Sequence, residues 1–182
     1  MEEYFDIVDE KNQPTGEIRL RSEAHTLGLW HRTVHVYFFR QTNKQLEFLV
    51  HLRSKNVDSA PNNWDTRFGG HLKAGETYEQ AAIGEIKDEV GIEVNLSSLI
   101  NGLARISNKK TNKEFSQVYY YKFTGELGDL SFKDNEVQEV KWLKVDQIIL
   151  ELTENPNNWA PRLEGFLEIL EYLTLHLKNK DY

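Results

Sequence analysis

Along most of the chain, short stretches of β-branched and aromatic residues alternate with polar turns, a pattern typical of a protein built around a β-sheet. The stretch "HRTVHVYFFR" (31–40) predicts a central strand, and "LEFLVHLR" (46–53) predicts a strand that pairs back on it. Pro14 and Gly16 mark a turn between two earlier strands. The predicted strands are 4–10, 17–21, 31–40, 46–53, 92–106, 115–124 and 137–143.

Other segments follow a helical period. Thr77 is placed as the N-cap of a helix over 78–90, and Gly91 as its C-terminal stop. Further helices are predicted at 145–152 and 161–178. The last of them has an amphipathic, core-facing stripe. This stripe on the helix 161–178 consists of Phe166, Ile169, Leu170, Leu173 and Leu177. Strands interleaved with few helices predict an α/β fold with a mixed sheet.

The bulk composition is that of an ordinary globular protein, with 182 residues, 39% hydrophobic and 28% charged. We expect one domain spanning residues 1–182, because no repeat or linker interrupts the pattern. A net charge of −7 offers no basic field for duplex nucleic acid. Cysteine is absent, which excludes disulfides and zinc–thiolate sites. The chain shows no secretory signal or membrane span, so a cytoplasmic location is predicted.

Carboxylates gather on the predicted helix 78–90. Glu85, Asp88 and Glu89 follow the spacing i, i+3, i+4, so a helical wheel places them on one solvent-open face. Ala81 falls one turn earlier on the same arc, where its small side chain would leave room. Such a cluster is either a solvated acidic face or a cradle for a hard divalent ion such as Mg²⁺, which prefers oxygen ligands. The neighbouring Gly-rich turn favours the cradle.

This segment resembles the Nudix box, G-x5-E-x7-R-E-U-x-E-E-x-G-U, in which U is aliphatic. Asp88 replaces one glutamate conservatively, and the resemblance extends over most of the chain. It implies an α/β/α sandwich and hydrolysis of a diphosphate linked to another group, often a nucleoside. The matching residues are Gly70, Glu76, Glu85, Ile86, Glu89, Gly91 and Ile92.

By the same resemblance, Glu85, Asp88 and Glu89 would hold Mg²⁺, with Mn²⁺ as an alternative. Glu85 and Glu89 would then be catalytic, and one glutamate would help to take a proton from the attacking water. A further acidic residue usually comes from a later loop. Glu136, six residues before Trp142, is the candidate, and its alternative is a surface charge at a strand edge.

One position departs from the box: Gly84 stands where the family has an arginine. That arginine would brace the loop glutamate, equivalent to Glu76. A glycine makes no ion pair and destabilises a helix interior by about 1 kcal/mol relative to alanine. Either Lys73 or Arg67 takes over this role, or the activity is weakened or lost.

The histidines suggest a second resemblance, to isopentenyl-diphosphate isomerase. That enzyme binds its metal with histidines near the places of His25, His31 and His71, together with two glutamates. Two departures count against the isomerase chemistry. Gly69 stands where a cysteine is needed, and only Glu114 is present in "NKEFSQVYYY", where we expect it to be out of register. His35 and His51, inside strands, are expected to be structural.

Three interpretations therefore remain: a Mg²⁺-dependent Nudix pyrophosphohydrolase, a Nudix-fold binding module without catalysis, and the isomerase. The predicted partner is a small-molecule diphosphate, neither duplex nucleic acid nor a membrane. The sequence leaves open which group the diphosphate carries and whether the chain forms a homodimer. The predicted substrate-binding residues are Gly70, His71, Arg53, Arg67, Trp64 and Trp159, with Lys55 and Trp30 as further candidates near the site.

Overall fold

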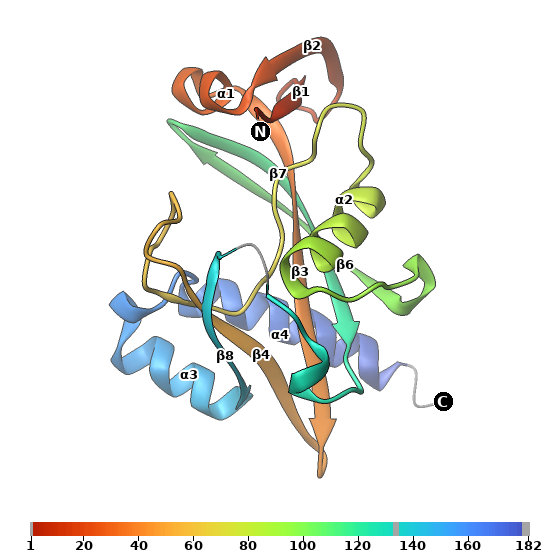
Figure 1. Ribbon diagram of the computed structural model, residues 1–182, viewed down its shortest axis with the longest axis vertical. Helices are drawn as coiled ribbons and strands as arrows, with labels where there is room; N and C mark the ends of the chain where they lie inside the picture. Colours follow the sequence, from red (N-terminus) through yellow and green to blue (C-terminus); the bar gives the residue numbers. More distant parts are fainter. Residues whose placement is uncertain (1, 133–134, 180–182) are drawn as a thin grey trace.

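A six-stranded mixed sheet forms the centre of the computed structural model, which describes residues 2–132 and 135–179 (Figure 1). Its strands are β3 (Trp30–Thr42), β4 (Gln45–Arg53), β5 (Trp64–Asp65), β6 (Leu99–Lys109), β7 (Asn112–Lys122) and β8 (Val137–Lys144). They lie in the order β5-β4-β3-β7-β6, and β8 also pairs with β4. β3 and β7 run parallel, whereas the other pairs are antiparallel.

Helices cover both faces of this sheet. One face carries α2 (Tyr78–Glu85) and the π-helical turn Ile86–Val90, and the other carries α3 (Val145–Glu154) and α4 (Leu163–Lys178) (Figure 1). The predicted α/β/α sandwich with a mixed sheet is confirmed. Short 3₁₀ turns occur at Leu96–Ser98, Leu127–Asp129 and Pro156–Asn158.

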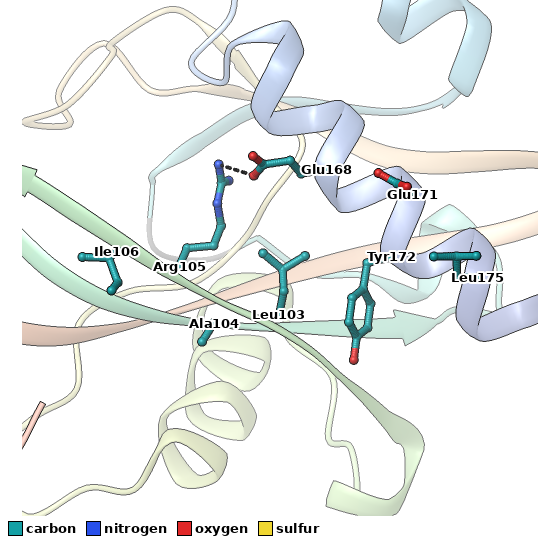
Figure 2. Close-up of a pocket in the computed structure, with 8 residues that line it drawn as sticks. All are labelled: Leu103, Ala104, Arg105, Ile106, Glu168, Glu171, Tyr172 and Leu175. Atoms are coloured by element: carbon teal, nitrogen blue, oxygen red, sulfur yellow. Dashed lines mark ion pairs between the residues drawn. The ribbon is translucent and has the colours of Figure 1, made fainter. Parts of the chain in front are cut away.

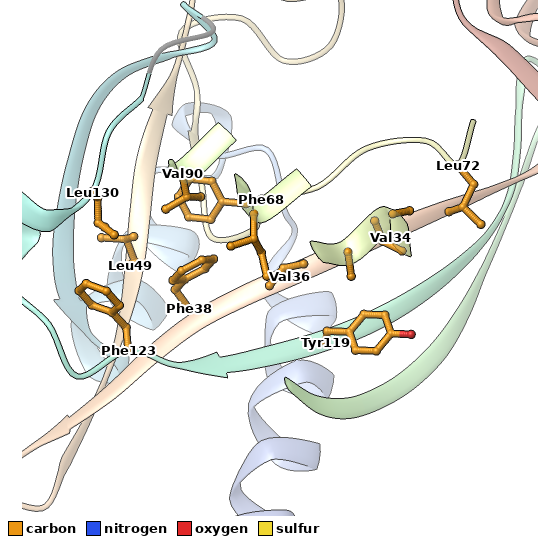
Figure 3. Close-up of a cluster of buried hydrophobic side chains, with 13 residues drawn as sticks. Val34, Val36, Phe38, Leu49, Phe68, Leu72, Val90, Tyr119, Phe123 and Leu130 are labelled. Carbon is orange, nitrogen blue, oxygen red and sulfur yellow. The ribbon is translucent and has the colours of Figure 1, made fainter. Parts of the chain in front are cut away.

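Each helical layer packs on its own hydrophobic core, because successive residues of a strand point to opposite faces. Val34, Val36 and Phe38 of β3 point into the core on the α2 side of the sheet (Figure 3). Ala82 of α2 and Ile86 of the π turn belong to the same core. Tyr37 and Phe39 point the other way, towards α3 and α4. On α4 the buried residues are Phe166, Ile169 and Leu173, all members of the predicted stripe.

The N-terminal residues form a separate antiparallel hairpin of β1 (Tyr4–Val8) and β2 (Pro14–Leu20), followed by α1 (Arg21–Leu27). The sequence analysis assigned no helix there. This hairpin holds the loop that leads into α2, because Gly75 donates a backbone N–H to Asp6 and Ala74 donates one to the Tyr4 carbonyl, both over 2.7 Å. The loop before the predicted carboxylate helix is thus fixed from outside the sheet.

The predicted helix 78–90 exists, with a change of winding inside it. Thr77 makes a capping box with Gln80, and Gly91 ends the helix with φ +78°, as the sequence predicts. The last turn is π-helical, however, and advances less per residue than the helical wheel assumed. Ala81, in the regular part of the helix before this turn, is buried in the core beside Ala82, so the expectation that it lies on the open acidic arc and leaves room above the carboxylates is wrong.

Most predicted strands are present within a few residues of their predicted bounds. Pro14 and Gly16, however, lie inside β2 and not in the turn that they were expected to mark, and the short strand β5 was not predicted. The other difference follows α2. The predicted strand 92–106 begins only at Leu99 and continues to Lys109, because 92–98 forms extended coil and a 3₁₀ turn. Within the described part of the chain, no helix combines the length and hydropathy needed to cross a membrane.

Candidate functional site

A cavity of about 770 Å³ opens between α1, the loop 54–63 and the sheet. It brings together residues that lie far apart in the sequence. Glu85 and Glu89 reach it from the α2 side, and Glu136 reaches it from the segment before β8. Of the predicted catalytic and substrate-binding residues, those that line it are Glu85, Glu89, Glu136, Gly70, His71, Arg53 and Arg67.

The two glycines at 69 and 70 allow the α2 carboxylates to reach the cavity. The segment is held against β3, since Val34 donates its N–H to the Gly70 carbonyl over 2.9 Å. Gly69, at φ +132°, donates its own N–H to Oε2 of Glu89 over 2.9 Å. Gly70 packs directly on Glu85, whose Oε1 would lie 2.5 Å from a Cβ at position 70. A side chain at position 70 would therefore displace Glu85, and one at position 69 would collide with the Val34 carbonyl.

Burial decides the protonation of Glu85. Removal from water, opposed by Lys73 and reinforced by Asp88, raises its pKa to about 7. A half-neutral carboxyl at physiological pH is poorly suited to be a surface charge. It is suited to a site where a cation restores its ionised form, so the environment of Glu85 fits a metal ligand.

A second group in the same cavity has the ligand types of a metal centre. The ligand atoms of His25, His31, His71 and Glu114 all lie within 4.8 Å of one another. The parallel pairing of β3 and β7 places His31 opposite Glu114, and Oε1 of Glu114 lies 3.8 Å from His31 Nε2 and 3.5 Å from His71 Nε2. The expectation that Glu114 is out of register is therefore wrong. Among the residues described, Glu85, Asp88 and Glu89 form no such tight group.

The hydrogen bonds around this histidine group direct its Nε2 atoms towards one another. His31 donates Nδ1–H to the Leu29 carbonyl over 2.9 Å, which holds the ring with Nε2 facing the group. His25 Nε2 lies 3.2 Å from that atom. Burial and the neighbouring imidazoles lower the pKa of His25 to about 4. Burial would raise the pKa of Glu114, but His31 and His71 outweigh it and hold it well below its usual range. Three imidazoles and one carboxylate fit a first-row transition metal.

Two arginines meet a buried acid at another part of the cavity wall. Asp65 is fully buried, and its Oδ1 accepts the N–H groups of Thr66 and Arg67 over 2.8 and 3.2 Å. Its Oδ2 lies 3.5 Å from Arg67 Nε and 3.7 Å from Arg53 Nη1. Arg67 also donates from Nη1 to His35 Nε2 over 3.4 Å.

Several predicted site residues lie away from the cavity. Asp88 is exposed and does not line it, because the π turn rotates this side chain away from Glu85 and Glu89. Glu76 accepts the N–H of Lys73 over 2.8 Å inside its own loop. Trp64 and Trp159 pack on each other with ring centres 6.3 Å apart, in the core under α3 and α4.

The further candidates are also placed elsewhere. Lys55 is exposed and does not line the cavity, and Trp30 packs on Phe115. A second hollow, between β6 and α4, contains none of the predicted site residues (Figure 2).

Sequence reasoning missed part of the cavity wall. His35 and His51 line it, although both were expected to be structural. Within the described residues, the buried Nδ1 of each has no hydrogen-bond partner. Asp65 also lines it and was not considered. The signal that could have found them is the alternation along β3 and β4, which places His31, Thr33 and His35 on one face of β3.

Comparison with known proteins decides the family. The model of the NUDIX domain matches residues 29–163, which is most of the chain. The chain belongs to the Nudix hydrolase family. A Nudix hydrolase of uncharacterised activity from Clostridium acetobutylicum is 30% identical over 151 residues, covering 81% of this chain and 72% of the relative.

Two further comparisons concern an isomerase and a solved structure. An isopentenyl-diphosphate Δ-isomerase of Klebsiella pneumoniae is 27% identical over 184 residues, covering 98% of this chain and 91% of that enzyme. The crystal structure of a Deinococcus radiodurans protein has the same fold, with a TM-score of 0.70, 22% identity, and coverage of 84% of this chain and 90% of that chain. The resemblance to the Nudix family, with an isomerase-like subgroup, is confirmed.

Proposed function

We propose that this Nudix protein is a divalent-metal-dependent pyrophosphohydrolase that cleaves a diphosphate linkage in a small molecule, with Mg²⁺ or Mn²⁺ as the metal. The observation that carries the proposal is the convergence of Glu85, Glu89 and Glu136 on one cavity beside the Gly69–Gly70 segment. All three come from the box or from the later loop that the family resemblance points to.

The charge of the cavity supports the need for metal ions. Carboxylates outnumber guanidinium groups among the side chains that line it, and the pKa values of His25, His35, His51 and His71 are all lowered, chiefly by burial. A diphosphate would be repelled from such a wall unless cations bind with it. When bound, a divalent ion would neutralise the diphosphate and make a water molecule more acidic.

The chain's own residues would then do the rest. Glu85 and Glu89 would hold the ion, and the N–H of Gly69 fixes the orientation of Glu89. Glu136 lines the same cavity and would accept the proton of the attacking water, the role expected of a general base. Asp88, which is exposed outside the cavity, would act on the ion only through the solvent.

The histidine group would hold a second, different metal. Imidazole ligands suit a transition metal such as Zn²⁺ or Mn²⁺ better than Mg²⁺. The resemblance to the isomerase rests on the histidines of this group. The isomerase chemistry needs paired glutamates, however, and the stretch 112–121 contains only Glu114. With glycine in place of the cysteine as well, the groups for proton transfer to and from an alkene are missing.

The test is a screen of nucleotide sugars, dinucleotides, deoxynucleotides and prenyl diphosphates for phosphate release with Mg²⁺. The proposal expects release from at least one class, and no release after chelation. Tight binding of a diphosphate without any turnover would instead favour the binding module. Conversion of isopentenyl diphosphate to its isomer would favour the isomerase.

A further inference from the structure

The wall around Asp65 differs from the metal-binding parts of the cavity in its charge. One buried carboxylate faces two guanidinium groups, Arg53 at 3.7 Å and Arg67 at 3.5 Å, so it neutralises only one of them. The carboxylate itself is fixed by two backbone N–H donors from Thr66 and Arg67. The result is a locally positive subsite in an otherwise acidic cavity.

Arg67 is the member of this subsite that is available to a ligand. Its side chain is 34% exposed, whereas Arg53 is 22% exposed and donates Nε–H to the Ser59 carbonyl over 2.9 Å. Arg67 uses Nε towards Asp65 and Nη1 towards His35. Among the described residues, none accepts a hydrogen bond from its Nη2. His51, 4% exposed on the same wall, keeps a buried Nδ1 that no described group partners.

The cavity offers polar recognition and no platform for a nucleobase. Among its described lining residues the aromatic side chains are all histidines, with no phenylalanine, tyrosine or tryptophan. Trp64 and Trp159, the residues predicted to stack on a base, do not line the cavity: Trp159 is buried in the core and the half-buried Trp64 packs against that core. A ligand in this cavity is therefore recognised by charge and hydrogen bonds more than by stacking.

We propose that Arg67, held by Asp65 and His35, binds a second anionic group of the substrate, so that the substrate is a phosphorylated sugar diphosphate and not a nucleoside derivative. Arg67 precedes Gly69 by two residues, so their Cα atoms are at most about 7 Å apart. Since Gly69 contacts Glu89, the two ends of the site lie within the length of one small molecule. A guanidinium group matches a phosphate by two parallel hydrogen bonds. The identity of the substrate rests on the proposed function, whereas the anion subsite does not.

The first test measures binding and needs no turnover. Calorimetric titration with ribose 5-phosphate, with ribose as the uncharged control, is carried out on the wild type, Arg67→Ala, Arg67→Met and Arg19→Ala. Arg19 lies exposed on β2, away from the cavity, and controls for the loss of a positive charge. Arg67→Met keeps much of the side-chain volume, so it covers the case in which Arg67→Ala does not fold.

We expect ribose 5-phosphate to bind the wild type and Arg19→Ala alike, and to bind both Arg67 variants about 10- to 100-fold more weakly. Equal affinity in the wild type and the Arg67 variants, or no binding to the wild type, would overturn the proposal.

The second test measures hydrolysis of 5-phosphoribosyl 1-diphosphate against ADP-ribose. The substitution of Arg67 should raise KM for the first by about tenfold or more and change that for ADP-ribose by less than threefold. An equal loss on both substrates would overturn the assignment of the substrate class. If no diphosphate is hydrolysed while the binding of ribose 5-phosphate still depends on Arg67, the proposed pyrophosphohydrolase activity is wrong and the anion subsite is supported.

Discussion

Gly70 lies against Glu85 so closely that a Cβ at position 70 would meet Oε1 at 2.5 Å and Cδ at 2.9 Å. The neighbour is the end of a side chain and not backbone, so a larger residue would displace the carboxylate and leave the chain path intact. The position of the Glu85 carboxylate, at the end of α2, therefore explains why the box begins with a glycine.

Gly70→Ala should therefore reduce diphosphate hydrolysis by about tenfold or more, with a small change in melting temperature. Gly128→Ala is the matched control, since a Cβ there would meet nothing within 4 Å. Steady-state kinetics and thermal melts of both variants check this. Full activity of Gly70→Ala would mean that the position of Glu85 is not critical.

His71→Ala should remove the transition-metal site and leave the fold in place. One imidazole fewer leaves three ligands for an ion that prefers four, so we expect about tenfold or more weaker binding of Zn²⁺. Metal content after dialysis, measured by mass spectrometry, is the readout. His51→Gln is the control, because His51 lies outside the histidine group. Equal metal content in the two variants would contradict a metal site at the histidine group.

Gly84→Arg should raise stability and activity together. A Cβ at Gly84 meets nothing within 4 Å, so the larger side chain is accommodated. Replacing a glycine inside the helix raises the free energy of unfolding by about 1 kcal/mol, which corresponds to a rise of about 2–4 °C in melting temperature. An ion pair with Glu76 would restore the brace of the box. Gly84→Ala separates the two effects, because alanine should raise the stability but cannot form the ion pair with Glu76. Higher stability with unchanged or lower turnover would contradict the expected gain and favour a site used for binding.

His51 should make the protein less stable in mild acid. Burial lowers its pKa from 6.5 to about 4, an effect that Asp65 opposes and that Arg53 and Arg67 reinforce. The unfolded chain therefore takes up the proton first, and the free energy of unfolding falls as the pH drops from 6.5 towards 4. Between pH 6.5 and 5 the loss is about 1–2 kcal/mol. Denaturant melts of the wild type and His51→Gln at several pH values check this, because the variant should lose less stability. Parallel curves would contradict it.

The sequence predicted the sandwich and the box helix well, because both depend on local signals. The strand alternation of β3, the cap at Thr77 and the stop at Gly91 are each set within a few residues. The convergence of His31 with Glu114 depends on the register of two strands that are distant in the chain, which no local signal encodes. The exposure of Asp88 depends on a π turn that a regular wheel does not represent. The burial of Trp159 depends on how α3 and α4 pack on the sheet.

The central claim is tested most directly by phosphate release from a diphosphate substrate by the wild type and Glu89→Gln, each with Mg²⁺ and with a chelator. The exposed Glu79→Gln on α2 is the matched control. The account predicts Mg²⁺-dependent release by the wild type and Glu79→Gln, and a loss of about 100-fold or more in Glu89→Gln with an unchanged fold. Wild-type turnover by Glu89→Gln, or turnover that persists in the chelator, would contradict a metal-dependent hydrolase that uses this carboxylate.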